Sequence, residues 1–242
     1  MSDFTFNGIS ASSMGLNIER RPRQYVPRKR LTTHQIPGRS GDLHEWDGSW
    51  ENFAMLYECW FKSDPVAAQA HKIKTWLSTA PVGARLEDTY DEEIYYRATY
   101  IGGANIENIH DRYGRFTVSF DCAPQACLKS GDSALTFEST GYIQNPTDFP
   151  AYPLIEFTGS VSGSIQIGSV HMQILFPDEF TEHTIRLDCA LREAWELADG
   201  QEIPTNTAVV SREFPVLMPG QNSVKITGGI DTVRVYPRWW QL

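Results

Sequence analysis

Carboxylates are the residues of this sequence whose types and spacing most readily suggest chemistry. Five acids fall within the eight residues 86–93, and Glu193 and Glu196 form a second candidate pair. Glycoside hydrolases use two carboxyl groups held roughly 5 to 9 Å apart across the bond that they cleave. The run at 86–93 lies in a turn between two expected strands, which would not hold its acids in that way, so we interpret it as a solvated loop. The hydrolase hypothesis, with Glu193 and Glu196 as nominal carboxylates, rests on composition alone.

The motifs of nucleophilic, metal and phosphate chemistry do not occur in the sequence. It contains no G-x-S-x-G, H-E-x-x-H, G-x-x-x-x-G-K-[ST] or G-x-G-x-x-G pattern. The four cysteines lack the spacing of a metal site, and we expect buried free thiols. Six histidines are scattered along the chain: His34, His44, His71, His110, His171 and His183. A lone histidine is more often a hydrogen-bonded polar residue than a ligand or base, so we predict no enzyme activity, no cofactor and no metal site.

Length and charge are consistent with an ordinary soluble protein. The 242 residues are 41% hydrophobic and 21% charged, enough to bury one or two cores, and two domains are expected. No charged-then-apolar leader opens the chain, and no segment approaches the ~20 apolar residues of a membrane span. Residues 1–130 carry 15 Lys+Arg against 16 Asp+Glu, whereas residues 131–242 carry 6 against 14. The second half is therefore the acidic one, and neither half has the basicity of a duplex-DNA binder.

One dense basic run lies between Glu19 and Arg30. Its cations are Arg20, Arg21, Arg23, Arg28, Lys29 and Arg30. Runs of this kind bind phosphate, so a nucleic-acid arm is one interpretation. The run is single and short, and Tyr25 is its one aromatic residue, so we favour a solvated or interface-facing connector.

A long apolar strand at 53–61 is expected to be the centre of the first half. Its side chains are nearly all apolar on both faces, which predicts a strand covered on both sides. Turns precede it at 37–41 and 47–48, where glycines supply positive φ. A helix over 65–79 should follow, capped by Asp64. Further strands are expected at 85–87, 94–101 and 115–122.

The second half shows only strand patterns. Each segment is short and bounded by Gly, Pro, Asn or Asp, which is typical of a jelly-roll β-sandwich. The expected strands are 134–139, 154–157, 164–167, 171–176, 183–187, 224–227 and 232–236. Because the composition changes between 123 and 131, we place a domain boundary near Lys129. The prediction is a mainly β protein with domains at 1–129 and 130–242.

Several motifs point to a known family. The first half contains the opening FNGISASSMGL, and then PGR-x-G-x-L, a D-G turn and an aromatic strand. The second half contains segment 152–159, preceded by Asn145-Pro146, and the ending FP-x-L-x-PG-x-N with a final PRW. Together these motifs resemble the distal tail proteins of siphophages, the Dit or phage tail component family. One departure is Pro146-Thr147, where a glycine is commoner in the family.

The resemblance implies an N-terminal β-sandwich belt domain with one α-helix, followed by a C-terminal galectin-like or jelly-roll β-sandwich. It implies a structural virion protein, six copies of which form a hub ring at the distal end of a long non-contractile tail. The implied partners are the tail tube protein and a tail-tip protein, tail-associated lysin or receptor-binding protein. DNA would be cargo in the central channel, and no membrane is involved. The expected location is the virion tail tip, after assembly in the bacterial host cytoplasm.

For the ring, we hypothesise that the cations of residues 20–30 face acids of the next copy. The candidate acids are Glu87, Asp88 and Glu92, with the helix at 65–79 nearby. In the alternative arrangement the basic run lines the channel, where it would hold passing phosphates and slow ejection. The acidic second domain is expected on the outer rim, where its copies are far apart.

The leading rival function is a carbohydrate-binding module for host-surface adsorption. Trp195, Trp239 and Trp240 could stack on sugar rings in that function. The two terminal tryptophans also belong to the closing motif of the family, where packing would explain them.

Overall fold

The computed structural model describes residues 2–20, 22, 25–102, 106–109, 112–177, 180–198 and 200–242. The chain divides into two compact units, Met1–Ala126 together with Leu242, and Cys127–Gln241. The predicted mainly β fold class is confirmed, and α1 (Val66–Thr79) is the one α-helix among the described residues.

The main sheet of the first unit is a curled antiparallel sheet. Its hydrogen-bonded order is β2–β1–β7–β8–β10–β6–β3, with β9 beside β10. Phe4 and Phe6 of β1 contact Phe120 of β10, and the rings of Phe4 and Tyr57 of β6 lie 4.4 Å apart. Strands from opposite ends of the sheet therefore share one core. The strands are β1 (Phe4–Phe6), β2 (Ile9–Ser10), β3 (Asn17–Arg20), β6 (Phe53–Lys62), β7 (Ala84–Asp88), β8 (Asp91–Tyr100), β9 (Glu107–Ile109) and β10 (Tyr113–Leu128).

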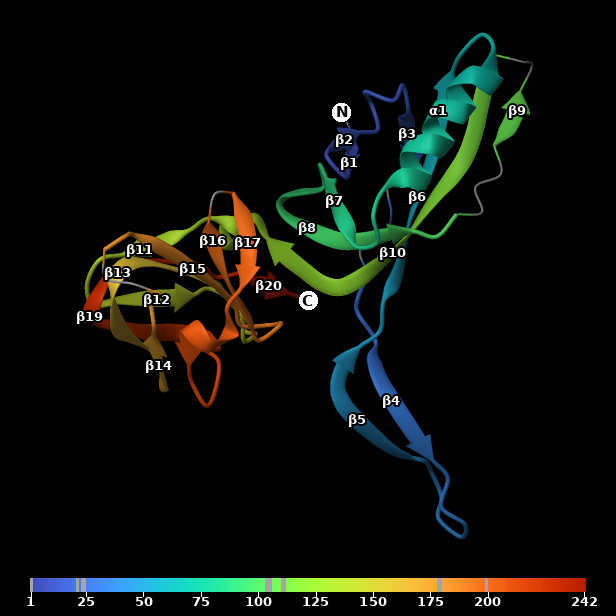
Figure 1. The fold of residues 1–242 in the computed structure, drawn as a ribbon. Helices are drawn as coiled ribbons and strands as arrows, with labels where there is room; N and C mark the ends of the chain where they lie inside the picture. The colour runs from blue at the N-terminus through green and yellow to red at the C-terminus, as the bar shows by residue number, and fades with distance from the viewer. Residues whose placement is uncertain are drawn as a thin grey trace. The chain divides into compact units, whose positions relative to one another are not determined.

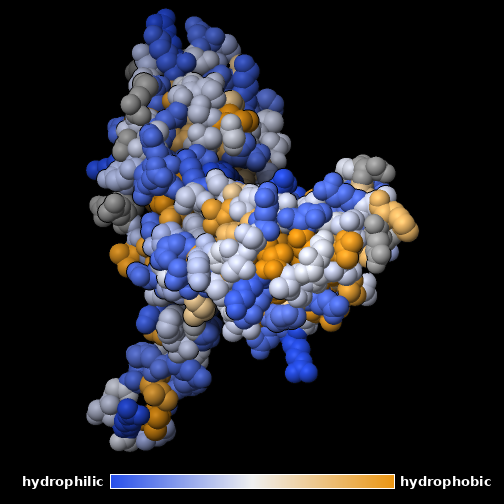
Figure 2. All heavy atoms as spheres, turned by 90° about the vertical axis from the view of Figure 1, so that its left-hand side faces the viewer, coloured by the Kyte–Doolittle hydropathy of each residue, from blue (hydrophilic) through white to orange (hydrophobic). Residues whose placement is uncertain are grey.

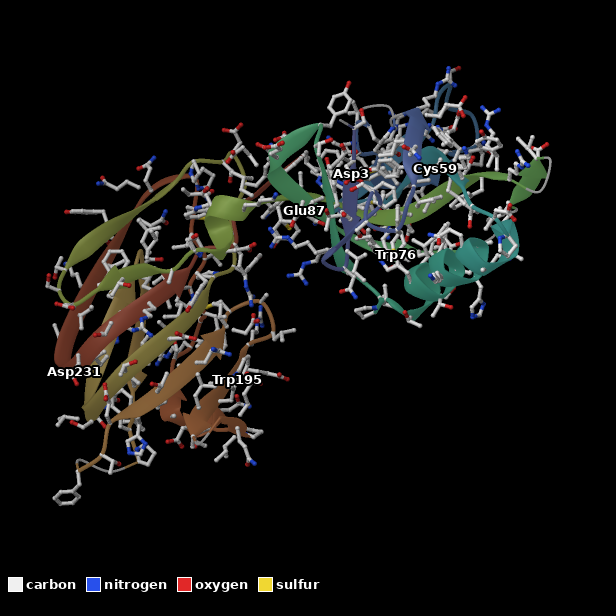
Figure 3. All side chains as sticks on the ribbon, turned by 90° about the horizontal axis from the view of Figure 1, so that it is seen from above. Asp3, Cys59, Trp76, Glu87, Trp195 and Asp231 are labelled. Carbon is white, nitrogen blue, oxygen red and sulfur yellow. The ribbon has the colours of Figure 1, made fainter. Side chains whose placement is uncertain are left out.

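Helix α1 packs against this core through one face. The helical spacing of Val66, Ala70, Ile73 and Leu77 predicted that face, and all four are buried. Trp76 was missed, although it is buried as well and lies between α1 and the sheet (Figure 3). Its indole N–H donates to the carbonyl of a β1 residue at 3.3 Å, so the largest side chain of the helix is fixed by a bond as well as by burial.

The start of the helix differs from the expectation by one residue. Pro65, not Asp64, is the N-cap residue, and no side chain caps the helix. Pro65 has extended backbone dihedrals, φ −78° and ψ 151°, which places Asp64 one position outside the reach of the first free N–H groups.

Strand β6 is covered on one face only, which corrects the expectation of a strand buried on both sides. Phe53, Tyr57, Cys59 and Phe61 point into the core, as the alternation predicts, and are buried. Ala54, Leu56, Glu58 and Trp60 point outward, and no layer of the described chain covers them. An apolar pattern reports that a face avoids water, but it does not say whether the same chain or another one covers it.

Strands β4 (Lys29–His34) and β5 (Leu43–Trp50) pair with each other and with no other described strand. Figure 1 shows them as a separate two-stranded arm of the first unit. All residues from 28 to 48 are exposed. The glycines predicted to supply positive φ do so, with φ of 80° at Gly38, 86° at Gly41 and 88° at Gly48.

The second unit is a two-layer sandwich built around two long, bent strands, β13 and β19. The first half of β13 and the second half of β19 pair with β15 and β11 in one layer, and β16 and β17 extend this layer from β15. The other halves of β13 and β19 pair with β12, β14 and, through β14, β18 in the second layer. The strands are β11 (Leu135–Phe137), β12 (Gly141–Asn145), β13 (Leu154–Ile167), β14 (Val170–Ile174), β15 (His183–Asp188), β16 (Glu193–Ala198), β17 (Gln201–Pro204), β18 (Val209–Val210), β19 (Gly220–Tyr236) and β20 (Trp240–Gln241).

Glycines make the bend possible. A Cβ on Gly163 would lie 2.7 Å from the carbonyl oxygen of Thr227, and one on Gly228 would lie 2.7 Å from Cα of Gly163. The two backbones therefore approach too closely for side chains, and the register shifts there. As a result, the segments expected as separate strands at 154–157 and 164–167 form one strand, as do those at 224–227 and 232–236.

Two asparagines from the motifs that resemble the tail family are buried and hold turns. Asn145 donates its side-chain N–H to the carbonyls of Phe149 and Leu217, and its side-chain oxygen accepts the backbone N–H of Thr147 at 2.9 Å. Asn222 closes the turn at Met218 through its side chain in the same manner.

No helix among the described residues is long and apolar enough to cross a membrane.

Candidate assembly interface

The outward face of β6 and β10 carries three exposed large hydrophobic side chains among polar and charged ones. Leu56 is 49% exposed and Trp60 is 36% exposed on β6, and Tyr113 is 40% exposed on β10. The rings of Trp60 and Tyr113 lie 6.3 Å apart. We call Leu56, Trp60 and Tyr113 the outer aromatic face. Exposed apolar surface grouped in this way is typical of a protein contact site.

Charged pairs lie within the outer aromatic face, since Glu58 stands between Leu56 and Trp60 on β6 and Arg115 is the register partner of Trp60. Arg115 contacts Glu19 at 2.6 Å, and Arg20 at the end of β3 contacts Glu58 of β6 at 3.5 Å. Both pairs are solvent-exposed, so each contributes little to stability. Charged groups placed among apolar side chains at a contact fix orientation more than affinity.

The arm carries a second apolar surface. Leu31 pairs with Trp46 across the two strands, and the rings of Trp46 and Trp50 lie 5.6 Å apart on the same side. The Lys29 ammonium lies 4.2 Å from the centre of the Trp46 ring, a cation–π contact. We call Leu31, Trp46 and Trp50 the arm face. Figure 2 shows hydrophobic residues along this hairpin, and Tyr25 anchors its base by stacking 4.5 Å from Phe53 of the core.

The structure separates the predicted basic run into two places. Arg20 ends β3 at the edge of the main sheet, whereas Lys29 and Arg30 belong to β4 of the arm and Arg28 directly precedes it. Arg21 and Arg23 lie outside the described residues. The run is therefore a connector from sheet to arm. Its charge affects Asp47, whose pKa is lowered mainly by hydrogen bonds from Ser49 and to a lesser degree by Arg30.

The predicted acids lie in strands, not in a loop. Glu87 and Asp88 belong to β7, and Glu92 belongs to β8, so the expectation of a solvated loop at 86–93 is corrected. Strands β7 and β3 are separated by three strands in the sheet order, so the acids and the end of the basic run lie on different strands of one chain.

Two of these acids already have partners within the chain. Glu87, labelled in Figure 3, contacts Arg85 at 2.5 Å. The Tyr57 hydroxyl donates to Asp88 at 2.6 Å. Burial, and then the nearby Asp88 carboxylate, raise the pKa of Tyr57, so its hydroxyl stays protonated and remains a donor. Glu92 is exposed and is the best placed of the three to meet a partner.

The candidate hydrolase carboxylates are not a pair. Glu193 and Glu196 lie three residues apart on β16, which puts their side chains on opposite faces of the strand. Glu196 instead contacts Nδ1 of His183 at 2.6 Å, and Nε2 of that ring lies 2.9 Å from the Thr181 hydroxyl. No sequence pattern indicated this contact, which joins β15 to β16. Within the described residues, no group of three or more His, Cys, Asp or Glu could hold a metal ion.

The three tryptophans proposed for sugar stacking have different environments. Trp239 is only 4% exposed, so a sugar could reach it only if the unit opened. Trp240 stacks on Phe149 at 4.4 Å and donates its indole N–H to the carbonyl of Pro150. Trp195 is half-buried on β16, and its indole nitrogen is buried without a hydrogen-bond partner among the described groups.

The fold is that of the hub and baseplate proteins of phage tails. Its similarity to a solved structure described as SPP1 Dit protein, "a paradigm of hub adsorption apparatus in Gram-positive infecting phages", covers 100% of both chains, with a TM-score of 0.71 and 13% identity. Two structures of the phage P2 baseplate in its activated conformation, with Ca and with Sr, match 97% of both chains with TM-scores of 0.57 and 0.59, at 5% and 6% identity. The chain matches no protein-family model and no curated protein.

Proposed function

We propose that this chain is a structural hub protein of a phage tail, in which six copies close into a ring at the distal end of a long non-contractile tail. The observation that carries the proposal is the similarity of fold to a hub protein along the whole length of both chains. The arm face and the outer aromatic face support it, because a monomer gains nothing from exposing them.

The ring contact that the two surfaces favour is heterologous. A cyclic ring of more than two copies needs two different patches, one meeting the other on the next subunit. The arm face lies on a hairpin that pairs with no other described strand, and the outer aromatic face is a sheet surface with exposed Leu56 and Trp60. We infer that the arm of one copy lies on the sheet of the next. Burying each large apolar side chain stabilises such a contact by about 1.5 to 3 kcal/mol.

The charged residues would set the register of that contact. Arg28 and Arg30 at the base of the arm could meet acids of the neighbour, of which Glu92 is exposed. Lys29 is already engaged by the tryptophans and Asp88 by Tyr57, so their contribution would be smaller. This arrangement keeps the cations out of the channel, where they would bind passing phosphates.

The two domains have different roles in this proposal. The belt domain, 1–129, forms the ring, and the sandwich domain, 130–242, lies on the periphery, where the repulsion between its acidic copies is smallest. One side of the ring would bind the tail tube protein and the other a tail-tip protein, lysin or receptor-binding protein. The DNA passes through, no step of the function is enzymatic, and assembly takes place in the host cytoplasm.

The test is the mass of the assembly in light scattering coupled to size exclusion. The wild-type chain should elute as a ring, and the double variant Leu56→Ser with Trp60→Ser should elute as a folded monomer. Leu191→Ser is the matched control, because Leu191 is exposed on the second unit, far from the contact in sequence. If the double variant assembled as the control does, the outer aromatic face would not be the ring contact.

A further inference from the structure

The outward surface of the second layer of the sandwich contains a shallow, open hollow of about 320 Å³. It lies where β13, β14 and β19 run side by side, and the side chains that line it include Ser162, Ser164, His171, Gln173 and Thr227. The structural role proposed above makes no use of this hollow.

The lining groups are of two kinds. Some are fixed by the chain: the hydroxyls of Ser164 and Thr227 lie 2.6 Å apart, and the Ser162 hydroxyl accepts the backbone N–H of Phe176 at 3.2 Å. The side chains of His171 and Gln173 are exposed and make no hydrogen bond to any described group. Their donors and acceptors are thus available to a ligand, beside hydroxyls whose positions are already set.

The floor of the hollow is backbone. Gly163 and Gly228 lie at the bend of the two long strands, where a Cβ on either would come within 2.7 Å of the opposite backbone. The hollow is therefore a consequence of the bend, and no side-chain rotation is needed to open it. Because packed backbone fixes the shape of the hollow, the hollow is preorganised for binding.

The charge of this layer distinguishes it from the rest of the unit. Residues 131–242 contain 14 acids, but strands β12 and β14 and segments 163–167 and 220–228 contain none. Lys225 is the one cation of these segments. In these segments amides, hydroxyls and an imidazole outnumber the one charged side chain, Lys225, and this composition suits a neutral ligand rich in hydroxyls.

We propose that the hollow binds a neutral saccharide, with Gln173 and His171 donating to and accepting from its ring hydroxyls. Tyr142 extends the site: it is 64% exposed on the same face and pairs with Ser223, four residues along β19 from Thr227. At ~3.3 Å per residue this places it roughly 13 Å away, within reach of an extended oligosaccharide that could stack on the ring. This inference gives the second unit a binding role on the cell surface. Binding of a saccharide by one copy does not depend on the proposed ring. Only the gain in avidity, which comes from several copies of a ring binding one surface together, rests on it.

The test is binding of the full chain to an array that carries neutral oligosaccharides beside sialylated and sulfated ones, followed by titration of the best neutral one. Gln173→Ala and His171→Ala should each weaken binding by about five- to tenfold, the effect of losing one hydrogen bond. Gln201→Ala, an exposed glutamine on the other layer, should change it less than twofold. Melting curves show whether each variant is folded.

Three results would overturn the proposal: no neutral oligosaccharide bound by the wild-type chain, binding confined to the anionic ones, or binding that Gln173→Ala and His171→Ala leave unchanged. The elution volume of the same samples reports ring formation separately, so failure of the saccharide site and failure of the ring are distinguishable.

Discussion

Trp60 on β6 and Tyr113 on β10 lie with their rings 6.3 Å apart on the outside of the first unit's sheet. On the inside of the same two strands, Tyr57 and Phe120 form a similar pair at 6.1 Å. The inner pair is buried by the chain itself, whereas the outer pair is left for water or a partner. Two adjacent strands with aromatic pairs on both faces are what a sheet between two layers requires, and the second layer is absent from the described part of this chain.

Charge reversal at the base of the arm should weaken the ring. We expect Arg28→Glu with Arg30→Glu to shift the chain toward monomer, because the two side chains would then repel acids of the neighbour. Adding Glu92→Lys should restore part of the assembly. Sedimentation velocity measures the change, and raising the salt concentration should reduce the difference between the variants.

Arg192→Glu is the control for the reversal, since Arg192 is an exposed residue of the second unit. If the arm reversal sedimented as this control does, the basic run would have no place at the contact.

The bend of the second unit should depend on Gly228 more than on Gly168. Both have positive φ, 88° and 58°, so alanine at either costs about 1 kcal/mol in backbone strain. Only at Gly228 would the new methyl group also meet backbone, 2.7 Å from Cα of Gly163. We expect Gly228→Ala to lower the free energy of unfolding by at least about 2 kcal/mol more than Gly168→Ala does. Urea denaturation measures both, and equal losses would show that the bend can relax.

The hydrogen bond from Tyr57 to Asp88 should stabilise the first unit. Tyr57→Phe is expected to cost about 1 to 2 kcal/mol, because the half-buried carboxylate loses a donor. The control is Tyr113→Phe, because the Tyr113 hydroxyl makes no hydrogen bond to any described group and its ring keeps the cation–π contact with Lys62.

The pH dependence of that difference follows from the raised pKa of Tyr57. A raised pKa stabilises the fold at every pH below that at which the unfolded tyrosine ionises, about 10. The loss in Tyr57→Phe should therefore be the same at pH 7 and pH 9 and should shrink only above pH ~10. A loss that grew between pH 7 and pH 9 would show that the hydroxyl ionises in the folded protein before it does in the unfolded chain, which would contradict the raised pKa.

The cysteines should differ in their reactivity. Burial raises the pKa of Cys59, Cys122 and Cys189 to about 12, so at pH 8 they stay protonated and unreactive. Cys127 is only half-buried. Iodoacetamide at pH 8 should add one group to the native protein and four after denaturation, as counted by mass spectrometry, and Cys127→Ser should abolish the native adduct. Rapid addition of a second group would indicate that one of the buried thiols is accessible.

The first half of the chain could be predicted where one strand or helix carries a complete pattern. The alternation of β6 and the helical spacing of Val66, Ala70, Ile73 and Leu77 both identify the buried faces, because each pattern needs only one element. The outward face of β6 could not be interpreted from the same pattern. Leu56 and Trp60 look like core residues in sequence, and only the fold shows that no layer of the described chain lies over them.

Features that depend on two distant segments could not be predicted. Gly163 and Gly228 allow the bend only because they meet in space, so the sequence suggested four strands where there are two. The contact between His183 and Glu196 is similar, since it depends on the pairing of β15 with β16. We expected a lone histidine to be a hydrogen-bonded polar residue. Its partner, Glu196, could be identified only from the pairing register of β15 and β16.

Electron microscopy of the purified wild-type protein in negative stain tests the central claim most directly. We predict ring-shaped particles with a central opening and six-fold symmetry, each with six times the 27.4 kDa mass of the chain. Uniform particles of single-chain mass at every concentration examined would contradict the proposed ring.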